Sequence, residues 1–406
     1  MTRRKTCLTC RSTKLTKIID LGMHPYADTF IDKKHKSMPL PVYNLSCVMC
    51  EECKLIQTEA ATDATERYNL FDYSYTSSNS LTSRSHWEEY CELISHKLSL
   101  SKESIIYEIG SNDGYLLSQF KNKLNNKVYG IDASRAMCDI ANEAGIFTEN
   151  CVFNQEESDR IVEKVGPSDL VIANNVYNHS DDPISFTMGV NTLLKNGGHY
   201  VFEVPYWKST IDSKKIDQIY HEHVTYYTIT SLKNLLEKCK FEIVNIEVVD
   251  YHGGSLRVIA KKNLNEKISH YKDITKQIKK ESYLFEKKTY EVLNKHLLKR
   301  KIDFVSKIIR YKKKGYNIIA IGAAAKGNTL LNFLNLNNSL IDFVTDTSKY
   351  KQGKTTPLSD IEICGDEVFA TVDKVCGLIL SWNLSEPIKN KIREINPNIE
   401  YISFYK

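Results

Sequence analysis

The middle of the chain alternates short apolar runs with segments of helical periodicity. Four runs have the length and composition of buried strands and occupy residues 105–109, 128–132, 168–175 and 199–205. Between them, apolar positions recur every three or four residues over 133–144 and 184–195. This alternation predicts an α/β domain with a doubly wound parallel sheet, whose last strand follows near residue 255.

The same pattern returns near the C-terminus. A buried run at 318–321 is followed by a loop of small residues at 322–328, a short helix at 329–334 and strands at 341–346 and 378–383. The lysine-rich block 264–314 has apolar positions spaced by three and four, which predicts amphipathic helices with solvated lysine faces. The sequence therefore predicts two Rossmann-like α/β domains joined by a helical bridge.

Composition narrows the classes of protein that fit this pattern. The chain has 406 residues, of which 42% are hydrophobic and 26% charged, with a net charge of +5 and 11 cysteines. The charge is mild and the lysines are dispersed, so nucleic acid is not an expected partner. No apolar run approaches the ~18 residues of a membrane span, and no apolar segment follows the basic start. We therefore expect a cytoplasmic enzyme without membrane contact, whose cysteines are thiols or metal ligands.

Two CxxC pairs lie in the first 60 residues, Cys7 with Cys10 and Cys50 with Cys53. Each pair can chelate through one tight turn, and four thiolates form a closed, structural zinc site. Such a metal would hold together a segment too short to build its own core. Cys47 also forms a CxxC with Cys50, but we prefer Cys53 because residues 54–57 then leave the site as a strand. Unligated thiols in a reduced cell are the alternative interpretation.

A glycine-bearing loop follows the first strand of the middle domain. Gly110 and Gly114 permit a tight turn, in which backbone N–H groups approach a ligand at the positive end of a helix. Asp132 ends the next strand and can hold the two hydroxyls of a ribose. Asn112 stands where the dinucleotide fingerprint has its second glycine, and Glu108 places a carboxylate before the first. Both features disfavour a pyrophosphate and favour a cationic cofactor, S-adenosylmethionine.

Further polar residues end other strands of the same sheet. Asp113 belongs to the glycine loop, Asn174 ends the strand at 168–175, and Glu203 ends the strand at 199–205. Since ligands of such sheets bind at the carboxyl ends of the strands, these residues should ring one crevice. We expect Asp113 and Asn174 to contact the cofactor together with the residues above.

Two groups of titratable residues follow strands of the middle domain. His179 comes soon after one strand end, and Tyr220, Glu222 and His223 belong to a Tyr-His-Glu-His run. On a strand, the two histidines of that run would share one face, and the chain contains no HExxH pattern of a zinc helix. Several titratable groups at the mouth of a cofactor crevice favour general acid–base chemistry over a structural network.

The C-terminal loop repeats the strand–loop–helix arrangement without an acid before its glycine. Lys326, Gly327 and Asn328 precede the helix, and Lys351 lies in a basic turn at 349–354. This arrangement suits a phosphate or diphosphate at the helix N-terminus, so we expect these residues to bind substrate. A purely structural domain is the alternative.

Residues 61–85 are polar and rich in hydroxyl groups and aromatic rings. Tyr68, Phe71, Tyr73 and Tyr75 are closely spaced and precede the run 76–80 of threonine, serine and asparagine. A segment of this composition is not core. The tyrosines favour a lid or pocket wall over a disordered linker.

Together these motifs resemble the S-adenosylmethionine-dependent sugar C-methyltransferase family. The resemblance covers nearly the whole chain and rests on the CxxC pairs, Tyr73-x-Tyr75-x-Ser77-Ser78 and the stretches 108–114, 220–223, 252–257 and 322–328. It implies methyl transfer to carbon 3 of a nucleotide-linked 4-keto deoxysugar, in surface-polysaccharide or antibiotic sugar biosynthesis. Its catalytic positions fall on Tyr75, His179, Tyr220, Glu222 and His223, with Tyr73 as an alternative to Tyr75.

We therefore expect four regions. They are a zinc-binding domain at 1–60, a lid or connection at 61–85, a methyltransferase domain at 86–263, and a helical bridge with a nucleotide-sugar-binding α/β domain at 264–406. Because the domains should each be self-sufficient, we expect a monomer. The sugar would lie between the central and C-terminal domains.

The expected mechanism forms an enolate beside the ketone. His223 would remove the proton, Tyr220 and His179 would donate to the enolate oxygen, Glu222 would order the loop or the sugar, and Tyr75 would close over the sugar. Two other interpretations stay open. One is a sugar O- or N-methyltransferase, and the other is a zinc-containing nucleotide-sugar-binding protein without catalysis.

Overall fold

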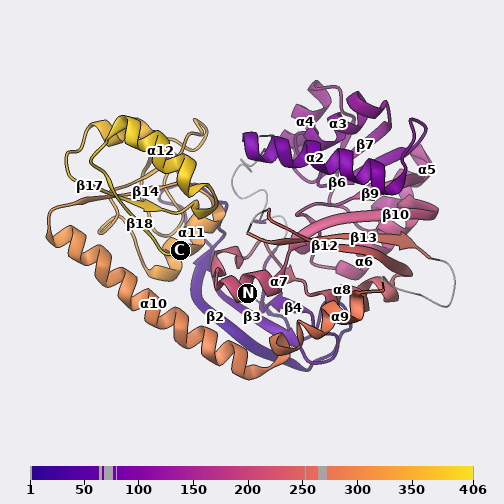
Figure 1. The fold of residues 1–406 in the computed structure, drawn as a ribbon, viewed down its shortest axis with the longest axis horizontal. Helices are drawn as coiled ribbons and strands as arrows, with labels where there is room; N and C mark the ends of the chain where they lie inside the picture. Colours follow the sequence, from indigo (N-terminus) through magenta and orange to yellow (C-terminus); the bar gives the residue numbers. More distant parts are fainter. Residues whose placement is uncertain are drawn as a thin grey trace.

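Two α/β lobes and a set of N-terminal strands make up the molecule (Figure 1). The computed structural model describes residues 2–63, 66–67, 76–78, 80–251, 253–263 and 272–405. The long helix α10 (Lys287–Lys313) runs along the lower left of the view, past β2 and β3, towards the C-terminal lobe. The predicted Tyr75 and its alternative Tyr73 lie outside the described residues, as does the start of the lysine-rich block.

The central domain is built on a seven-stranded sheet with the order β12-β13-β10-β9-β6-β7-β8. Its strands are β6 (Ile105–Ile109), β7 (Lys127–Asp132), β8 (Thr148–Asn150), β9 (Ser168–Ile172), β10 (Leu194–Pro205), β12 (Phe241–Val249) and β13 (Ser255–Lys262). The neighbouring strands β10, β9, β6, β7 and β8 are parallel to one another, as predicted. The expectation of a wholly parallel sheet is wrong at the other edge, where β13 is antiparallel to β10 and β12. Gly253 and Gly254 have positive φ in the short connection from β12, so the chain reverses without a crossover helix.

Helices cover both faces of this sheet. The helices of this domain are α2 (Leu81–Leu98), α3 (Tyr115–Leu124), α4 (Arg135–Glu143), α5 (Gln155–Val165), α6 (Pro183–Leu193), α7 (Trp207–Ser213) and α8 (Ile229–Lys238). α2 and α3 pack on one face through Trp87 and Leu117, and α6 and α8 pack on the other through Val190 and Leu235. The side chain of Ser80 caps α2, because its hydroxyl oxygen accepts a hydrogen bond from Ser83 N over 3.1 Å.

The N-terminal region forms an antiparallel sheet with the order β11-β4-β3-β2. Its strands are β2 (Leu15–Pro25), β3 (Val42–Cys50), β4 (Ile56–Thr58) and β11 (Thr225–Tyr226), and β1 (Thr2–Arg3) pairs with β5 (Ala60–Ala61) beside it. β11 comes from the central region of the sequence. The Tyr-His-Glu-His run lies in the turn before β11 and not on a strand, because His223 N donates to Tyr220 O and closes the turn.

The C-terminal domain has a five-stranded sheet with the order β16-β15-β14-β17-β18, and all its neighbours are parallel. Its elements are β14 (Asn317–Ile321), α11 (Ala325–Leu334), β15 (Phe343–Thr345), β16 (Ile363–Cys364), β17 (Val375–Ile379), α12 (Ser385–Ile395) and β18 (Glu400–Ser403), and the bridge holds α9 (Ile274–Lys279) and α10. β17 ends before the predicted strand end. Trp382 therefore lies in a 3-10 helix, η6 (Trp382–Leu384).

The regions share hydrophobic cores. One cluster joins Leu45 of β3, Trp207 of α7, Leu297 of α10 and Leu330 of α11. Another includes Cys7 and residues of the central sheet. The expected boundaries thus divide the sequence but do not separate independent cores. Within the described ranges, no helix combines the length and the apolar character needed to cross a bilayer.

Candidate active site and metal site

The four predicted zinc ligands meet at one point. The Sγ atoms of Cys7, Cys10, Cys50 and Cys53 all lie within 4.8 Å of one another. Tetrahedral zinc with thiolates at ~2.3 Å requires sulfur–sulfur distances of about 3.8 Å. The pairs Cys7–Cys53 and Cys10–Cys50 are 3.4 and 3.5 Å apart, so the donor set fits the metal. Cys47 lies outside this cluster, in the apolar core, which decides between the overlapping CxxC pairs.

Two matching turns form this metal site. Arg11 N donates to Cys7 O, and Lys54 N donates to Cys50 O, each over 3.0 Å. Arg11 and Lys54 both have positive φ, of 63° and 64°. The two CxxC segments thus have the same backbone geometry, and each presents its sulfur atoms from a single turn.

The predicted cofactor loop turns sharply between β6 and α3. Gly110, Asn112 and Gly114 have φ values of 72°, 52° and 75°. A Cβ atom on Gly110 would lie 2.8 Å from Cβ of Val176, which leaves no room for a side chain. The loop stands between β6 and β9, where the strand order reverses, which is the usual ligand position in such sheets.

Replacing Gly110 with Ala should therefore weaken S-adenosylmethionine binding by at least ~10-fold, because the loop must move away from Val176. Gly145→Ala is a matched control, since Gly145 also has positive φ but a Cβ there meets nothing closer than 4.0 Å. Calorimetric titration of both variants measures the two dissociation constants. Equal losses in the two variants would show that backbone strain, and not this contact, governs the loop.

Asp132 is tied to the loop by both carboxylate oxygens. Its Oδ2 accepts a hydrogen bond from Asn112 N, and its Oδ1 accepts one from Ser134 N, each over 2.8 Å. Burial raises the pKa of Asp132. The carboxylate thereby links the end of β7 to the glycine loop after β6, at the place where a ribose would lie.

The C-terminal domain repeats this arrangement. Asp346 follows β15, and its Oδ2 accepts from Ala323 N while its Oδ1 accepts from Ser348 N, each over 2.9 Å. Ala323 belongs to the small-residue loop after β14, and Gly322 has φ of 100°. Both domains thus contain a strand, a loop, a helix and an acid in the same arrangement. In each, the acid accepts one hydrogen bond from a backbone N–H of the loop and one from the backbone N–H two residues after itself.

Glu108 is the most distinctive group of the cofactor loop. It is 5% exposed, and within the part of the chain that the structure describes its Oε2 has no hydrogen-bond partner. Burial, together with the charges of Asp113 and Asp132, raises its pKa well above the usual range. A buried carboxylate without a donor is costly, and a ligand with cationic or N–H groups would satisfy it. The residues therefore fit S-adenosylmethionine.

Residues 77–78 of the predicted lid segment contact this loop. Ser77 N donates to Asn112 Oδ1 over 2.8 Å, and Ser78 N donates to Asp113 Oδ2 over 3.0 Å. The hydroxyl of Ser77 also contacts Asp113. The side chains of Asn112 and Asp113, which we expected to contact cofactor, thus hold residues 77–78 over the loop.

Asn174 belongs to a buried polar network below the loop. Its Oδ1 accepts from Glu203 N over 2.8 Å. The carboxylate of Glu203 pairs with Arg257 at 2.6 Å and with His86 at 2.9 Å, and it is fully buried. The expected crevice residues Asn174 and Glu203 are therefore adjacent, and α2 is tied to β10 and β13 through His86.

His223 and Tyr220 form a hydrogen-bonded pair. His223 Nδ1 lies 2.9 Å from the carbonyl oxygen of Gln218, which can only accept, so Nδ1 carries the proton. In the neutral ring, Nε2 is then an acceptor, and the Tyr220 hydroxyl donates to it over 2.6 Å. The ring of His179 stands edge-on to His223, with centroids 4.9 Å apart. The structure thus brings together three of the predicted catalytic residues.

The fourth described residue of that set, Glu222, faces the N-terminal region. Its Oε1 accepts from Asp28 N over 2.9 Å. Burial raises the pKa of Glu222 to about 7 and that of Asp28 to about 6. Asp28 also lies close enough to Lys351 and Asp346 for their charges to act on its carboxyl group. The site is therefore bordered by the N-terminal, central and C-terminal regions.

The predicted substrate residues of the C-terminal domain have diverse contacts. Lys351 Nζ donates to Ala323 O over 2.6 Å. Asn328 is buried, and its Nδ2 donates to Ala27 O over 2.7 Å, which joins α11 to the N-terminal region. Gly327 lets α11 pack closely, since a Cβ there would lie 3.1 Å from Gly322 O. Burial lowers the pKa of Lys326, and the nearby Asp217 opposes that shift. Their role in substrate binding stays a prediction.

Sequence reasoning did not single out Asp28, Asp217 or Trp382 as parts of this site. Asp28 lies in the turn after β2, Asp217 in the 3-10 helix η3 (Ile216–Gln218), and Trp382 in η6 after β17. Asp28 and Trp382 reach the site only through contacts between regions far apart in sequence. Trp382 follows a buried strand at its carboxyl end, and this position was the one local signal that could have indicated a site residue.

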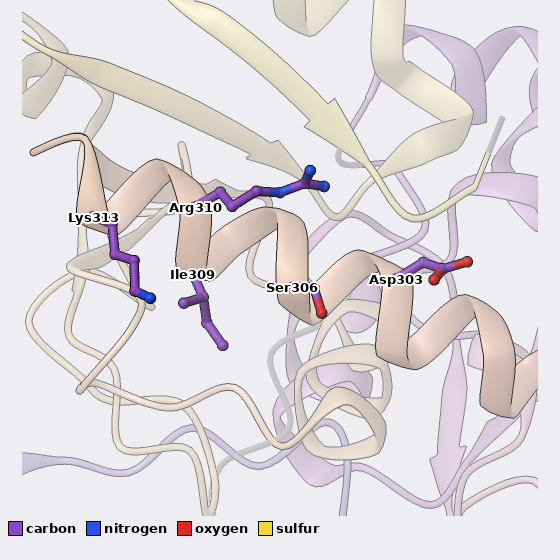
Figure 2. A pocket seen from close by; sticks show the side chains of 5 residues that line it. All are labelled: Asp303, Ser306, Ile309, Arg310 and Lys313. Carbon is purple, nitrogen blue, oxygen red and sulfur yellow. The ribbon is translucent and has the colours of Figure 1, made fainter.

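A surface hollow on α10 lies outside this site. Figure 2 shows its lining side chains projecting from successive turns of one helix; they are Asp303, Ser306, Ile309, Arg310 and Lys313. None of the predicted site residues belongs to this set. The hollow therefore gives no support for a second ligand site.

Three family models match successive parts of the chain. The C-methyltransferase C-terminal domain matches residues 250–400, a methyltransferase domain matches 83–246, and a family described as "Putative zinc binding domain" matches 7–68. The chain is also 25% identical to C-methyltransferase NovU of Streptomyces niveus over 400 residues, which are 97% of this chain and 93% of that protein. The protein is an S-adenosylmethionine-dependent methyltransferase.

Two solved structures that the methyltransferase matches have a lower sequence identity to it than C-methyltransferase NovU has. Magnesium protoporphyrin IX methyltransferase of Synechocystis PCC 6803, with bound SAH, is 13% identical and has a TM-score of 0.36, covering 44% of this chain and 83% of that chain. The plantazolicin methyltransferase BpumL in complex with SAH is 13% identical with a TM-score of 0.35, covering 44% and 82%. The match to a methyltransferase domain, the match to a zinc-binding domain and the four-cysteine cluster confirm the expected cofactors: the methyltransferase uses S-adenosylmethionine and carries a structural zinc site.

Proposed function

We propose that this methyltransferase adds a methyl group to carbon 3 of a nucleotide-linked 4-keto deoxysugar, through an enolate. The observation that carries the proposal is the pair formed by Tyr220 and His223, in which His223 Nε2 lies 2.6 Å from the phenol oxygen while Nδ1 is held by the carbonyl oxygen of Gln218. Carbon is not nucleophilic until it loses a proton, so C-methylation requires such a base. A ketone beside that carbon makes the proton acidic enough for a histidine to remove.

His223 is the base in this mechanism. The carbonyl of Gln218 holds its Nδ1–H, so Nε2 is the only ring nitrogen able to take the proton. The Tyr220 hydroxyl occupies this lone pair in the resting site. When the ketone substrate lies against the pair, Tyr220 donates instead to the enolate oxygen while His223 takes the carbon proton.

His179 supports the same oxyanion as a neutral donor. Burial, with a contribution from the positive charge of Arg67, lowers its pKa to about 3. Arg67 and Arg4 both pair with Asp181 beside the site. A neutral imidazole offers one N–H to the enolate and does not compete with His223 as a cation.

The substrate would span the central and C-terminal domains. Glu222 orders the segment around Asp28 and presents a carboxyl group to sugar hydroxyls. Lys326, at the start of α11, and the loop held by Asp346 suit the phosphates of the nucleotide. Bound S-adenosylmethionine supplies the electrophilic methyl group. We place the reaction in deoxysugar biosynthesis, with the enzyme acting as a monomer.

Incubation with a nucleoside-diphosphate 4-keto-6-deoxysugar in deuterated buffer tests this function. With S-adenosylmethionine, mass spectrometry should show the gain of one methyl group on carbon. Without it, we expect deuterium to enter at the carbon beside the ketone, because His223 can form the enolate alone. The ordinary deoxysugar nucleotide, which lacks the ketone, is the control and should show neither change.

Other outcomes separate the alternatives. Methyl transfer to oxygen or nitrogen of a substrate without a ketone, and without exchange, would indicate an O- or N-methyltransferase. Binding of the nucleotide sugar without consumption of S-adenosylmethionine would indicate a binding protein. Neither result is compatible with the proposed enolate.

A further inference from the structure

We propose that Trp382 and Tyr405 of the C-terminal domain are positioning residues for His223, and that they act through Asp217. The inference rests on the proposed function, because it concerns the residue that we assign as base. It extends that function by giving the C-terminal domain a part in proton transfer and not only in binding substrate.

The contacts form a continuous chain. Trp382 Nε1 donates to Asp217 Oδ2 over 2.6 Å, and Asp217 N donates to the Tyr405 hydroxyl over 3.2 Å. Asp217 belongs to the 3-10 helix η3 (Ile216–Gln218), so the next carbonyl along the chain is that of Gln218. This carbonyl accepts from His223 Nδ1 over 2.9 Å. Trp382 and Tyr405 thus hold η3 at Asp217. The next residue, Gln218, fixes the tautomer of His223.

The surroundings give this chain a rigid setting. Asp217 is 1% exposed and Tyr405 is 4% exposed, so water does not compete for these bonds. The Trp382 ring lies under Lys215 Nζ at 3.4 Å from its centroid. On the central domain, a Cβ added to Gly253 would lie 2.5 Å from the Trp382 ring, so only glycine admits the indole here. The indole is therefore held from several sides while it bonds to Asp217.

A physical reason links these contacts to proton transfer. A histidine acts as a base only in the tautomer whose free nitrogen faces the substrate, and the hydrogen bond at the other nitrogen selects that tautomer. If η3 moves, the carbonyl of Gln218 no longer lies opposite Nδ1. The imidazole then divides between its two tautomers, and part of the enzyme has a protonated nitrogen where the lone pair is required.

Two conservative variants test the inference. Trp382→Phe keeps an aromatic ring but removes the five-membered ring of the indole with its N–H. Tyr405→Phe removes only the hydroxyl. In each, kcat should fall about 10-fold, whereas KM for the sugar nucleotide and Kd for S-adenosylmethionine should change less than ~2-fold. Tyr401→Phe is the matched control, because its hydroxyl bonds to Lys389 O, on the side of the domain formed by α12. This control should keep the full kcat.

The tautomer itself is read by nitrogen NMR of the protein labelled with ¹⁵N-histidine. The His223 signals are assigned by their loss in His223→Asn. The unaltered enzyme should show a single Nδ1–H form, and both variants should show a mixture. A His223 that keeps the Nδ1–H form in both variants would overturn the proposal, whatever happens to turnover. A mixture of tautomers with full methyl transfer would leave the positioning contacts in place but reject His223 as the base, so the two proposals fail separately.

Discussion

Replacing His223 with Asn should lower kcat for methyl transfer by about 10³-fold, because general-base catalysis contributes factors of this order. The Kd of S-adenosylmethionine should stay within about 2-fold of its original value, since the cofactor loop makes none of its described contacts through His223. Deuterium exchange beside the ketone should disappear in the same variant. Single-turnover kinetics and calorimetry measure these quantities on one preparation.

Tyr220→Phe separates a catalytic pair from two independent residues. The hydroxyl of Tyr220 bonds directly to His223 Nε2, so the two side chains should act as a unit. We expect the double variant to lose little more activity than His223→Asn alone. Tyr316→Phe is the control, because it removes a hydroxyl that contacts only Glu400 on the surface among the described residues. Losses that multiply in the double variant would contradict a shared role in proton transfer.

Removal of the zinc should unfold much more than the first 60 residues. In isolated zinc-finger peptides the metal contributes roughly 10 kcal/mol or more of folding free energy. Here the site shares a core with the central sheet, and Asn234 of α8 donates to the carbonyl of Cys53. Cys50→Ser should therefore abolish zinc binding and lower the thermal unfolding temperature of the whole protein. Metal analysis and calorimetry follow both effects.

Cys364→Ser is the matched control for that experiment. Cys364 lies on β16, outside the metal cluster, and among the described residues its thiol has a hydrogen-bond contact only with the carbonyl of Val344, at 3.8 Å. The control should retain one zinc ion and the original unfolding temperature. If Cys50→Ser instead loses zinc while the main unfolding transition is unchanged, the metal does not stabilise the shared core.

The parts of the site that sequence predicted correctly are those encoded locally. Two cysteines that must chelate through one turn are two residues apart, whatever the rest of the fold does. The strand, glycine loop and helix around Gly110 lie within one short stretch, and the acid Asp132 follows on the next strand. For the same reason the C-terminal copy around Asp346 could be recognised before its contacts were known.

The errors arose where a turn interrupts a strand-like pattern and where residues far apart in sequence meet. The Tyr-His-Glu-His run alternates in a way that suits a strand, but the hydrogen bond from His223 N to Tyr220 O turns it. The pattern of β13 does not distinguish parallel from antiparallel pairing, and two glycines after β12 decide it. Asp28 has no local signature and Trp382 has only its place after a buried strand, because each reaches the site from a region more than a hundred residues away in sequence.

The origin of β11 imposes an order on biosynthesis. Both CxxC pairs leave the ribosome together with β2, β3 and β4, whereas residues 225–226, which complete that sheet, are made only after strands β6 to β10 of the central domain. Until then the edge of β4 has no partner, and an exposed strand edge promotes aggregation. Zinc captured early would hold the nascent strands in register during this interval. Metal supply during translation should therefore govern the yield of folded enzyme as well as its final stability.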